Sequence, residues 1–216
     1  MNITRIKDHK LVAEAFEIAR EYLIKCDLHK RELDPPYTPK ESYAIDVVMS
    51  ISNVISCLDQ LYHSISMLSG YRKINSKMNR YDYIVFGIEN YYLRLTSVFD
   101  RCLRLVNIIF QFGLPEKECK DTTIIKNEHI KDTSIAKALK NLNRFTHSEQ
   151  KLDKLGVYYL AAEDDSFQKY FHLYKLDTDL YIKNRKSEFK KNVDELETCV
   201  EAIFDSLYDT FLEKLN

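Results

Sequence analysis

The residues best suited to do chemistry lie close together in the run Leu139–Gln150, which reads LKNLNRFTHSEQ. Asn143 and His147 are four residues apart, so they share one face wherever this run is helical. Arg144 stands between them. An arginine can hold a phosphate through paired hydrogen bonds, and a histidine can exchange a proton near neutral pH. The run therefore suggests phosphate binding beside a proton-transfer group. The alternative is an exposed polar helix end, where basic residues offset the negative end of the helix dipole.

A second candidate is a cluster of basic residues placed before the last predicted helix. With Tyr174 and Tyr181 nearby, this cluster could bind single-stranded RNA by charge and stacking. The alternative is a solvated helix face, diluted by Glu188. The connector 71–80 is also basic and is open to the same two interpretations. The cluster comprises Lys183, Arg185, Lys186, Lys190 and Lys191, and the RNA-binding candidates are Lys140, Arg185, Lys186 and Lys190.

Neither a metal site nor a phosphate-binding glycine loop is indicated. The six histidines and five cysteines are dispersed, and no two histidines have the H-x-x-x-H spacing. An odd number of widely spaced cysteines argues against a disulfide framework and for reduced, structural thiols. The four glycines are isolated from one another, whereas dinucleotide folds and P-loops need glycines a few residues apart. We therefore expect no metal and no cofactor.

Length and composition indicate a helical globular chain. The 216 residues are 45% hydrophobic and 30% charged, which is sufficient for a buried core. Four glycines and four prolines are too few for the many tight turns of a β-sandwich or barrel. The net charge of −1 excludes a basic field over the whole chain but not a local basic patch. We recognise no signal peptide and no apolar run of roughly 20 residues, so we expect a cytoplasmic protein without a membrane span.

Apolar residues that recur at three- and four-residue steps predict about five helices, two or three of them long. Thr38 or Ser42 can cap the second helix, and Thr133 or Ser134 can cap the fourth. The predicted ranges are 8–29, 38 or 42 to about 69, about 82–112, about 133–147 and about 187–215. Packed antiparallel, these helices form an all-α up-down bundle. We expect one domain over 1–216, with an N-terminal helix and proline-rich link over 1–37 and the bundle over 38–216.

Breaks between the helices are marked by glycine and proline. Gly70 is expected to end the second helix with a positive φ, and Gly113 with Pro115 ends the third. Residues 114–132 are polar and show no periodicity, which predicts a long loop. The run 148–163 is consistent with either a short strand or a helical turn.

The order of these elements, together with the run Asn143–His147, resembles the HEPN superfamily, a class of α-helical bundles. Many members carry an arginine, then usually an asparagine, then a histidine, as in R-N-x-x-x-H. Aligned on His147, this chain has Asn143 and His147 in place, but Leu142 occupies the arginine position. The segment 89–101 also resembles the core helix of HEPN-like bacterial proteins. The resemblance covers about residues 40–215.

The resemblance implies metal-independent RNA cleavage, in which paired subunits bring two motifs together and the RNA 2′-OH attacks the adjacent phosphate. It gives His147 the acid/base role and Asn143 an orienting role. Arg144 or Lys140 would then have to supply the missing cation. Because Leu142 replaces the arginine that would hold the scissile phosphate, we expect weak or absent cleavage.

The resemblance also implies partners. We expect a homodimer with an isologous interface, because the family commonly dimerises and the apolar stripe of the third helix is longer than we expect a lone bundle to need. RNA, an antitoxin or a nucleotidyltransferase-like protein are the further partners, in a defence or toxin–antitoxin setting. The alternative is a non-catalytic helical protein-interaction module, since some family members have no nuclease activity.

Overall fold

The protein is described here by a computed structural model, which describes residues 5–23, 37–70, 80–147 and 178–215. Every regular element in these four ranges is a helix, and none of the residues in them forms a strand. The all-α prediction is confirmed. The run 148–163 and the aromatic stretch after it lie outside the described residues.

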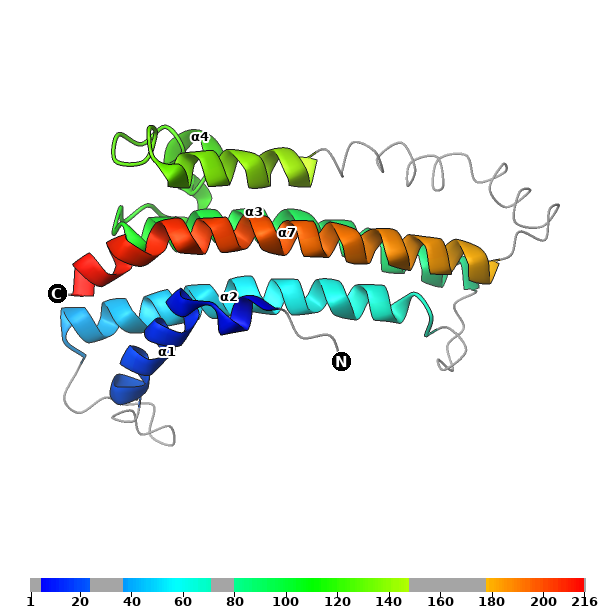
Figure 1. Ribbon diagram of the computed structural model, residues 1–216, viewed down its shortest axis with the longest axis horizontal. Coiled ribbons are helices and arrows are strands. Elements are labelled where there is room, and N and C mark those ends of the chain that lie inside the picture. Colours follow the sequence, from blue (N-terminus) through cyan, green and yellow to red (C-terminus); the bar gives the residue numbers. More distant parts are fainter. Residues whose placement is uncertain (1–4, 24–36, 71–79, 148–177, 216) are drawn as a thin grey trace.

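Three long helices form the body of the molecule: α2 (Pro39–Met67), α3 (Arg80–Ile109) and α7 (Thr178–Leu215). Along the chain, with the helix over 134–147 included, the helix directions alternate: α2 and the helix over 134–147 run one way, and α3 and α7 run the other (Figure 1). α2 packs against both α3 and α7. Antiparallel neighbours of this kind bury one apolar stripe against another. The predicted up-down bundle is therefore confirmed.

The start of α2 is fixed by a capping box. Thr38 Oγ1 accepts a hydrogen bond from the Glu41 amide at 3.2 Å, and Glu41 Oε2 accepts one from the Thr38 amide at 2.8 Å. Pro39 occupies the first helical position, where its missing N–H removes no helical hydrogen bond. Of the two predicted caps, Thr38 is the one used. Replacing such a cap by alanine typically costs about 1 kcal/mol.

The apolar stripe of α3 lies within the core of the single chain. Tyr91, Leu95 and Val98 in its centre are completely buried. Since this surface is covered by α2 and α7, it is not available to a second subunit. The helix ends three residues before the predicted end, and the left-handed backbone of Gln111 (φ 56°) and Gly113 (φ 67°) turns the chain. Every predicted stripe residue up to 109 is buried: Ile84, Ile88, Tyr91, Leu95, Val98, Cys102, Leu105 and Ile109.

α7 begins nine residues earlier than its apolar pattern predicts. Its first turns carry the basic cluster, which the sequence placed before the helix. Phe189 inserts into the core here, stacked on Tyr91 with ring centroids 3.8 Å apart and ring planes 4° apart. The Tyr91 hydroxyl also donates to the Phe189 carbonyl oxygen at 3.4 Å. These contacts hold the first part of α7 against α3, so the charged residues around Phe189 face outward.

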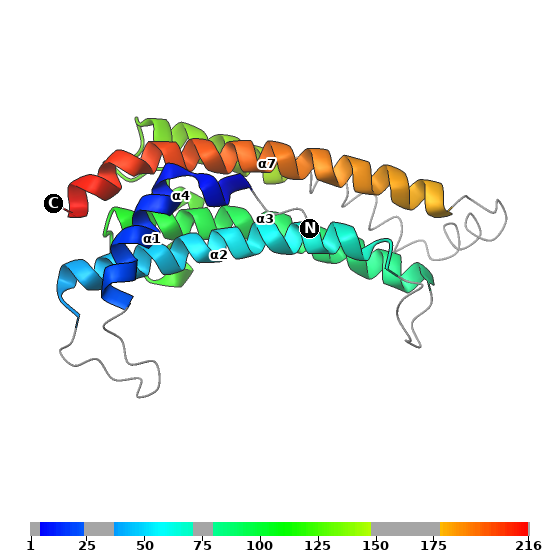
Figure 2. The same cartoon turned by 60° about the horizontal axis from the view of Figure 1, so that its bottom comes forward.

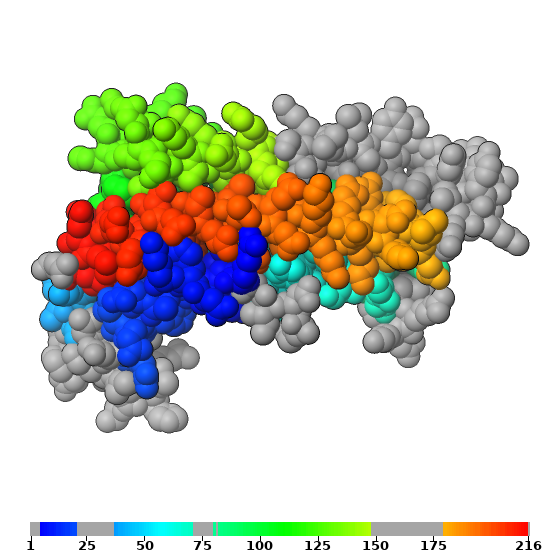
Figure 3. Space-filling model, viewed as in Figure 1, coloured from blue at the N-terminus to red at the C-terminus, as the bar shows by residue number. Residues whose placement is uncertain are grey.

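Residues 114–132 are more ordered than the predicted loop. They contain a 3-10 helix, η3 (Glu116–Glu118), a short helix, α4 (Asp121–Ile124), and successive turns. Ile124 and Ile130 are completely buried, although they are too few to produce a helical period in the sequence. This segment and the helix over 134–147 form a layer on one side of α7 (Figure 3).

The N-terminal elements cover the opposite side of α7. η1 (Arg5–Asp8) and α1 (Lys10–Leu23) pack on α2 and α7 (Figure 2). Arg5 Nε lies 3.4 Å from a Glu197 carboxylate oxygen and 2.9 Å from one of Glu201. Burial, aided by nearby Glu197, raises the pKa of Tyr62 to about 12. The predicted helix began at residue 8, and residues 24–29 of it lie outside the described residues.

α2 is the most apolar of the long helices that the structure describes. By length and hydropathy it could cross a membrane, which the sequence analysis did not recognise. However, 56% of its most apolar window is buried inside the protein, as in the core helix of a bundle. The stretch is therefore accounted for by packing against α3 and α7.

Two glycines mark the close approach of α2 and α3. Gly70 follows α2 and donates its amide to the Met67 carbonyl at 2.6 Å, but it does not have the positive φ that was predicted. Gly87 lies on α3 directly under the end of α2. A Cβ atom at Gly87 would lie 2.7 Å from Leu68 Cδ2, which is closer than van der Waals contact.

Candidate nucleic-acid interface

The predicted motif lies on a helix whose described residues are 134–147, and the predicted helix end at about 147 adjoins residues outside the described ones. One face of this helix is apolar and joins the core through Ile135, Leu139 and Leu142. Leu142 is 0% exposed. The position at which an arginine would hold phosphate therefore faces the protein interior, and its side chain contributes to packing.

The opposite face is cationic. Lys137, Lys140, Arg144 and His147 are all exposed and follow one another at steps of three or four residues. The sequence from 133 to 147 contains no acidic residue. In the part of the chain that the structure describes, neither lysine nor Arg144 forms an ion pair. We call these four residues the motif face.

The two polar motif residues have defined partners. Asn143 Nδ2 donates to Asp121 Oδ2 of α4 at 3.3 Å. His147 Nδ1 lies 2.9 Å from the Asn143 carbonyl oxygen, which can only accept, so Nδ1 carries the proton in this contact. Nε2 is then the ring nitrogen that can accept a proton. The structure thus places Asn143 and His147 on adjacent turns of one helix face, as predicted.

A surface pocket of about 480 Å³ adjoins the motif face and is bounded by α4. Asp121 lies in it next to Asn143, so a phosphate here would meet a carboxylate as well as cations. The charged residues that line it are of both signs: Lys126, Lys131, Lys140, Asp121 and Asp132. This mixture makes it a weaker anion site than the exposed cations alone suggest.

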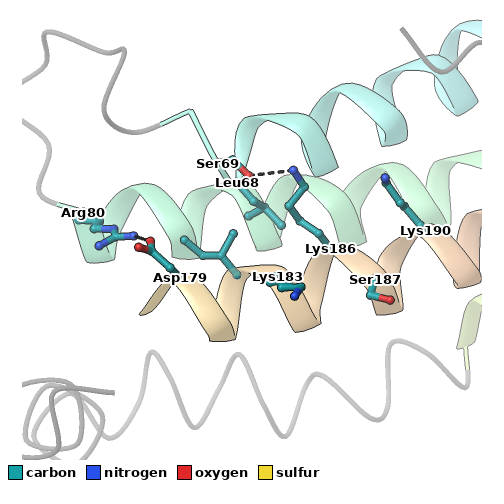
Figure 4. Close-up of a pocket in the computed structure, with 9 residues that line it drawn as sticks. Leu68, Ser69, Arg80, Asp179, Lys183, Lys186, Ser187 and Lys190 are labelled. Atoms are coloured by element: carbon teal, nitrogen blue, oxygen red, sulfur yellow. Dashed lines mark hydrogen bonds and ion pairs between the residues drawn. The ribbon is translucent and has the colours of Figure 1, made fainter. Parts of the chain in front are cut away.

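The basic residues of α7 divide between two surfaces. Lys186 and Lys190 line a pocket of about 560 Å³ between the end of α2, the start of α3 and the start of α7, which we call the basic pocket (Figure 4). Arg185 does not line it. Arg185 Nη1 instead donates to Glu188 at 3.0 Å, and its guanidinium lies 5.7 Å from the Tyr181 ring centroid.

The structure therefore does not gather all the predicted RNA-binding residues in one place. Lys140 belongs to the motif face, Lys186 and Lys190 belong to the basic pocket, and Arg185 belongs to neither. The sequence analysis missed Lys137, although its spacing from Lys140 and the lack of acidic neighbours were visible. It also missed that Ser69 lines the basic pocket, because this contact joins residues 117 positions apart.

The cysteines in the described ranges show no arrangement for metal or redox chemistry. Cys57, Cys102 and Cys119 are free and buried, and Cys199 is free and half-buried. Burial raises the pKa of all four thiols, which keeps them protonated and poorly reactive. In the four described ranges, no group of three or more His, Cys, Asp or Glu side chains is positioned to hold a metal ion.

Comparison with known proteins gives one informative result. A family described as HEPN_Cthe2314-like HEPN matches residues 51–214. The match covers most of the chain, including all of α3, the helix over 134–147 and nearly all of α7. No curated protein and no solved structure matches the chain.

Proposed function

The chain belongs to the HEPN superfamily, and from this premise we propose that it binds RNA through the motif face and cleaves it weakly or not at all. The observation that carries the proposal is the division of one helix into two faces. Lys137, Lys140, Arg144 and His147 point to solvent, while Leu142 is completely buried behind them.

Support for RNA binding comes from charge and geometry. From 137 to 147 a helix rises by about 15 Å, so the motif face offers cations along several nucleotides of a single strand. Lysine and arginine side chains on such a surface neutralise backbone phosphates and release counterions. Arg144 adds a planar fork that can hold one phosphate by two hydrogen bonds.

Support for weak cleavage comes from what surrounds His147. A histidine can serve as an acid or base, but a developing negative charge on phosphate also needs a fixed cation. Leu142 cannot provide one. Arg144 and Lys140 share the exposed face with His147, so they are the available substitutes, but Asp121 beside Asn143 opposes the accumulation of negative charge.

The family relationship extends the proposal to assembly and setting. We propose a homodimer that pairs two motif helices, acting in defence or in a toxin–antitoxin pair with an antitoxin or a nucleotidyltransferase-like protein. Light scattering tests the assembly, and a 25.6 kDa species at micromolar concentration would contradict the homodimer.

A second candidate function, a protein-interaction module, is favoured by one specific observation. Phe86 and Leu93 on α3 are 47% and 60% exposed and lie seven residues apart, on one face of the helix. Exposed apolar side chains in register are typical of helix-mediated contacts. Leu93→Lys should abolish the association if this face forms it, and should leave RNA binding by the motif face unchanged.

The binding test uses a short single-stranded RNA with a 5′-hydroxyl end and fluorescence anisotropy at low salt. Lys140→Ala combined with Arg144→Ala should weaken binding by about tenfold, because two phosphate contacts are lost. The matched control is Lys40→Ala, which removes an exposed lysine from the start of α2. Equal affinities for the wild type, the double variant and the control would refute the motif face as the RNA site.

The cleavage test uses the same RNA with its ends labelled. We expect little or no product, and any product should persist in EDTA, since the proposed chemistry uses no metal. His147→Ala should reduce any such activity by about 10²-fold, the usual loss when a general acid or base is removed. Vigorous cleavage that survives His147→Ala would show that the motif is misassigned.

A further inference from the structure

The basic pocket lies at the end of the bundle opposite the C-terminus and is built from three separate helices (Figure 4). Ser69 lies in the turn that follows α2, Arg80 is the first residue of α3, and the three lysines Lys183, Lys186 and Lys190 belong to α7. Its volume of about 560 Å³ falls within the range of pockets that hold small ligands. It shares no lining residue with the pocket beside the motif face.

The charge in this pocket is strongly unbalanced. Among the residues that the structure describes, four cations line it, against one carboxylate, that of Asp179, which is paired with Arg80. This pair leaves three lysines, and none of them forms an ion pair with a carboxylate of the described residues. Cations that converge in a concave site raise the local concentration of anions more than cations on an open surface do.

The orientation of the lysines is fixed by the packing of α7. Lys183, Lys186 and Lys190 follow one another at steps of three and four residues, so they lie along one side of the helix. Phe189, stacked on Tyr91 in the core, sets the rotation of α7 at this point. Lys186 Nζ also donates to Ser69 Oγ at 2.8 Å, which holds this ammonium group over the pocket (Figure 4).

The remaining lining is apolar. Leu68 and Ile182, which are 1% and 8% exposed, form part of the wall behind the lysines. A ligand that combines an anionic group with a flat, less polar group would match both parts. A nucleotide has this composition, with a phosphate for the lysines and a base for the apolar wall.

We propose that the basic pocket binds the phosphate monoester of a nucleotide, either free or at the 5′ end of an RNA strand. A monoester is close to a dianion at neutral pH and presents three oxygens, which suits a pocket lined by three lysines. A phosphodiester inside a strand carries one charge and would need an open groove on both sides of the pocket. The proposal does not depend on RNA binding by the motif face.

The experiment has two arms that distinguish the two sources of the phosphate. The first titrates AMP and, for comparison, adenosine, into the full chain by calorimetry. The second compares binding of one short RNA carrying a 5′-phosphate with the same RNA carrying a 5′-hydroxyl. Both arms are repeated with Lys186→Ala and Lys190→Ala. The control is Lys191→Ala. The exposed Lys191 side chain lies about 100° around α7 from Lys190, and its Nζ lies 3.7 Å from a Glu195 carboxylate oxygen.

The free-nucleotide form of the proposal predicts that AMP binds, that adenosine does not, and that Lys186→Ala weakens AMP by about tenfold. The RNA-end form predicts tighter binding of the 5′-phosphorylated strand, with the difference lost in Lys186→Ala and Lys190→Ala. Thermal unfolding followed by circular dichroism checks that the variants are folded. The proposal is overturned if neither AMP nor the 5′-phosphate adds binding, or if Lys191→Ala loses as much as Lys186→Ala. Because the motif face is tested with 5′-hydroxyl RNA, failure of either proposal leaves the other testable.

Discussion

The motif face and the basic pocket are both cationic, but they are built in opposite ways. The cations of the motif face project from the convex side of one helix, and Asp121 stands beside them. Those of the basic pocket come from two helices and line a cavity, where the hydroxyl group of Ser69, which follows α2, holds one of them. A convex face suits a long polyanion that can move along it, whereas a concave site suits one compact anion.

The two surfaces also differ in how they can be found: the motif face from a sequence motif, and the basic pocket only from the folded structure. The motif face contains the residues that resemble the family motif, but the key position, Leu142, has become part of the core. The basic pocket matches no motif that we recognise, yet its charge is less opposed by carboxylates. The resemblance therefore identifies the helix over 134–147, while the pocket with the larger excess of cations is the basic pocket.

The largest expected effect is that of restoring the family arginine. Leu142→Arg places a charge in a fully buried position without a partner, and it should lower the free energy of unfolding by about 4 kcal/mol. Urea denaturation followed by circular dichroism measures this change. Leu142→Met, which keeps the volume, should cost less than about 1.5 kcal/mol and serves as the control. A stable Leu142→Arg variant that gains RNA cleavage would show that the motif face lacks only its cation.

The second prediction concerns the independence of the two surfaces. Lys186→Glu should weaken AMP binding by about tenfold or more. It removes a cation from the pocket and puts there a carboxylate that repels the phosphate of AMP. It should change the affinity for 5′-hydroxyl RNA by about twofold or less. The double variant of Lys140 and Arg144 should show the reverse pattern. If both variants weaken both ligands equally, the two surfaces act as one site and the comparison fails.

The third prediction tests whether Asp121 limits the motif face. Asp121→Asn removes a negative charge next to Asn143 while keeping a side chain that can bond to it. RNA binding at low salt should strengthen by about threefold, and the gain should disappear at high salt because exposed charges are screened. AMP binding should not change. A weaker or unchanged affinity for RNA at low salt would mean that phosphates do not pass near Asp121.

The smallest effect is expected for the anchor of the basic pocket. Ser69→Ala removes the acceptor at 2.8 Å from Lys186 Nζ but leaves every charge in place. AMP binding should weaken by about twofold, the scale of one exposed hydrogen bond that orients a side chain. Calorimetry measures it beside Ser187→Ala, a second hydroxyl that lines the same pocket. A loss as large as that of Lys186→Ala would mean that the serine, rather than the lysine, contacts the ligand.

The helices were predictable because their signals are local. Thr38 and Glu41 stand three residues apart and cap α2, and Gly113 with Pro115 follows α3. The early start of α7 was not predictable, because its first turns are basic and depend on the stacking of Phe189 against Tyr91 from another helix. In the same way, the buried Ile124 and Ile130 order a segment whose sequence looks like a polar loop.

The candidate sites follow the same rule. The motif residues share one helix, so their spacing alone placed Asn143 and His147 on adjacent turns. The basic pocket brings Ser69, Arg80 and Lys186 together across three helices, and no spacing in the sequence records that meeting. The burial of Leu142 could be predicted, because this residue continues the apolar three- and four-residue steps of Ile135, Ala138 and Leu139.

The shape of the basic pocket depends on the missing Cβ atom of Gly87. Leu68 lies over Gly87 so closely that a methyl group on α3 would have to push the leucine side chain aside, and Leu68 is part of the pocket wall. The position of the Leu68 side chain in the pocket wall thus depends on Gly87, which does not itself line the pocket. Gly87→Ala would change the shape of the basic pocket while leaving all its charged residues unaltered. The shape of the pocket and its charge can therefore vary independently of each other.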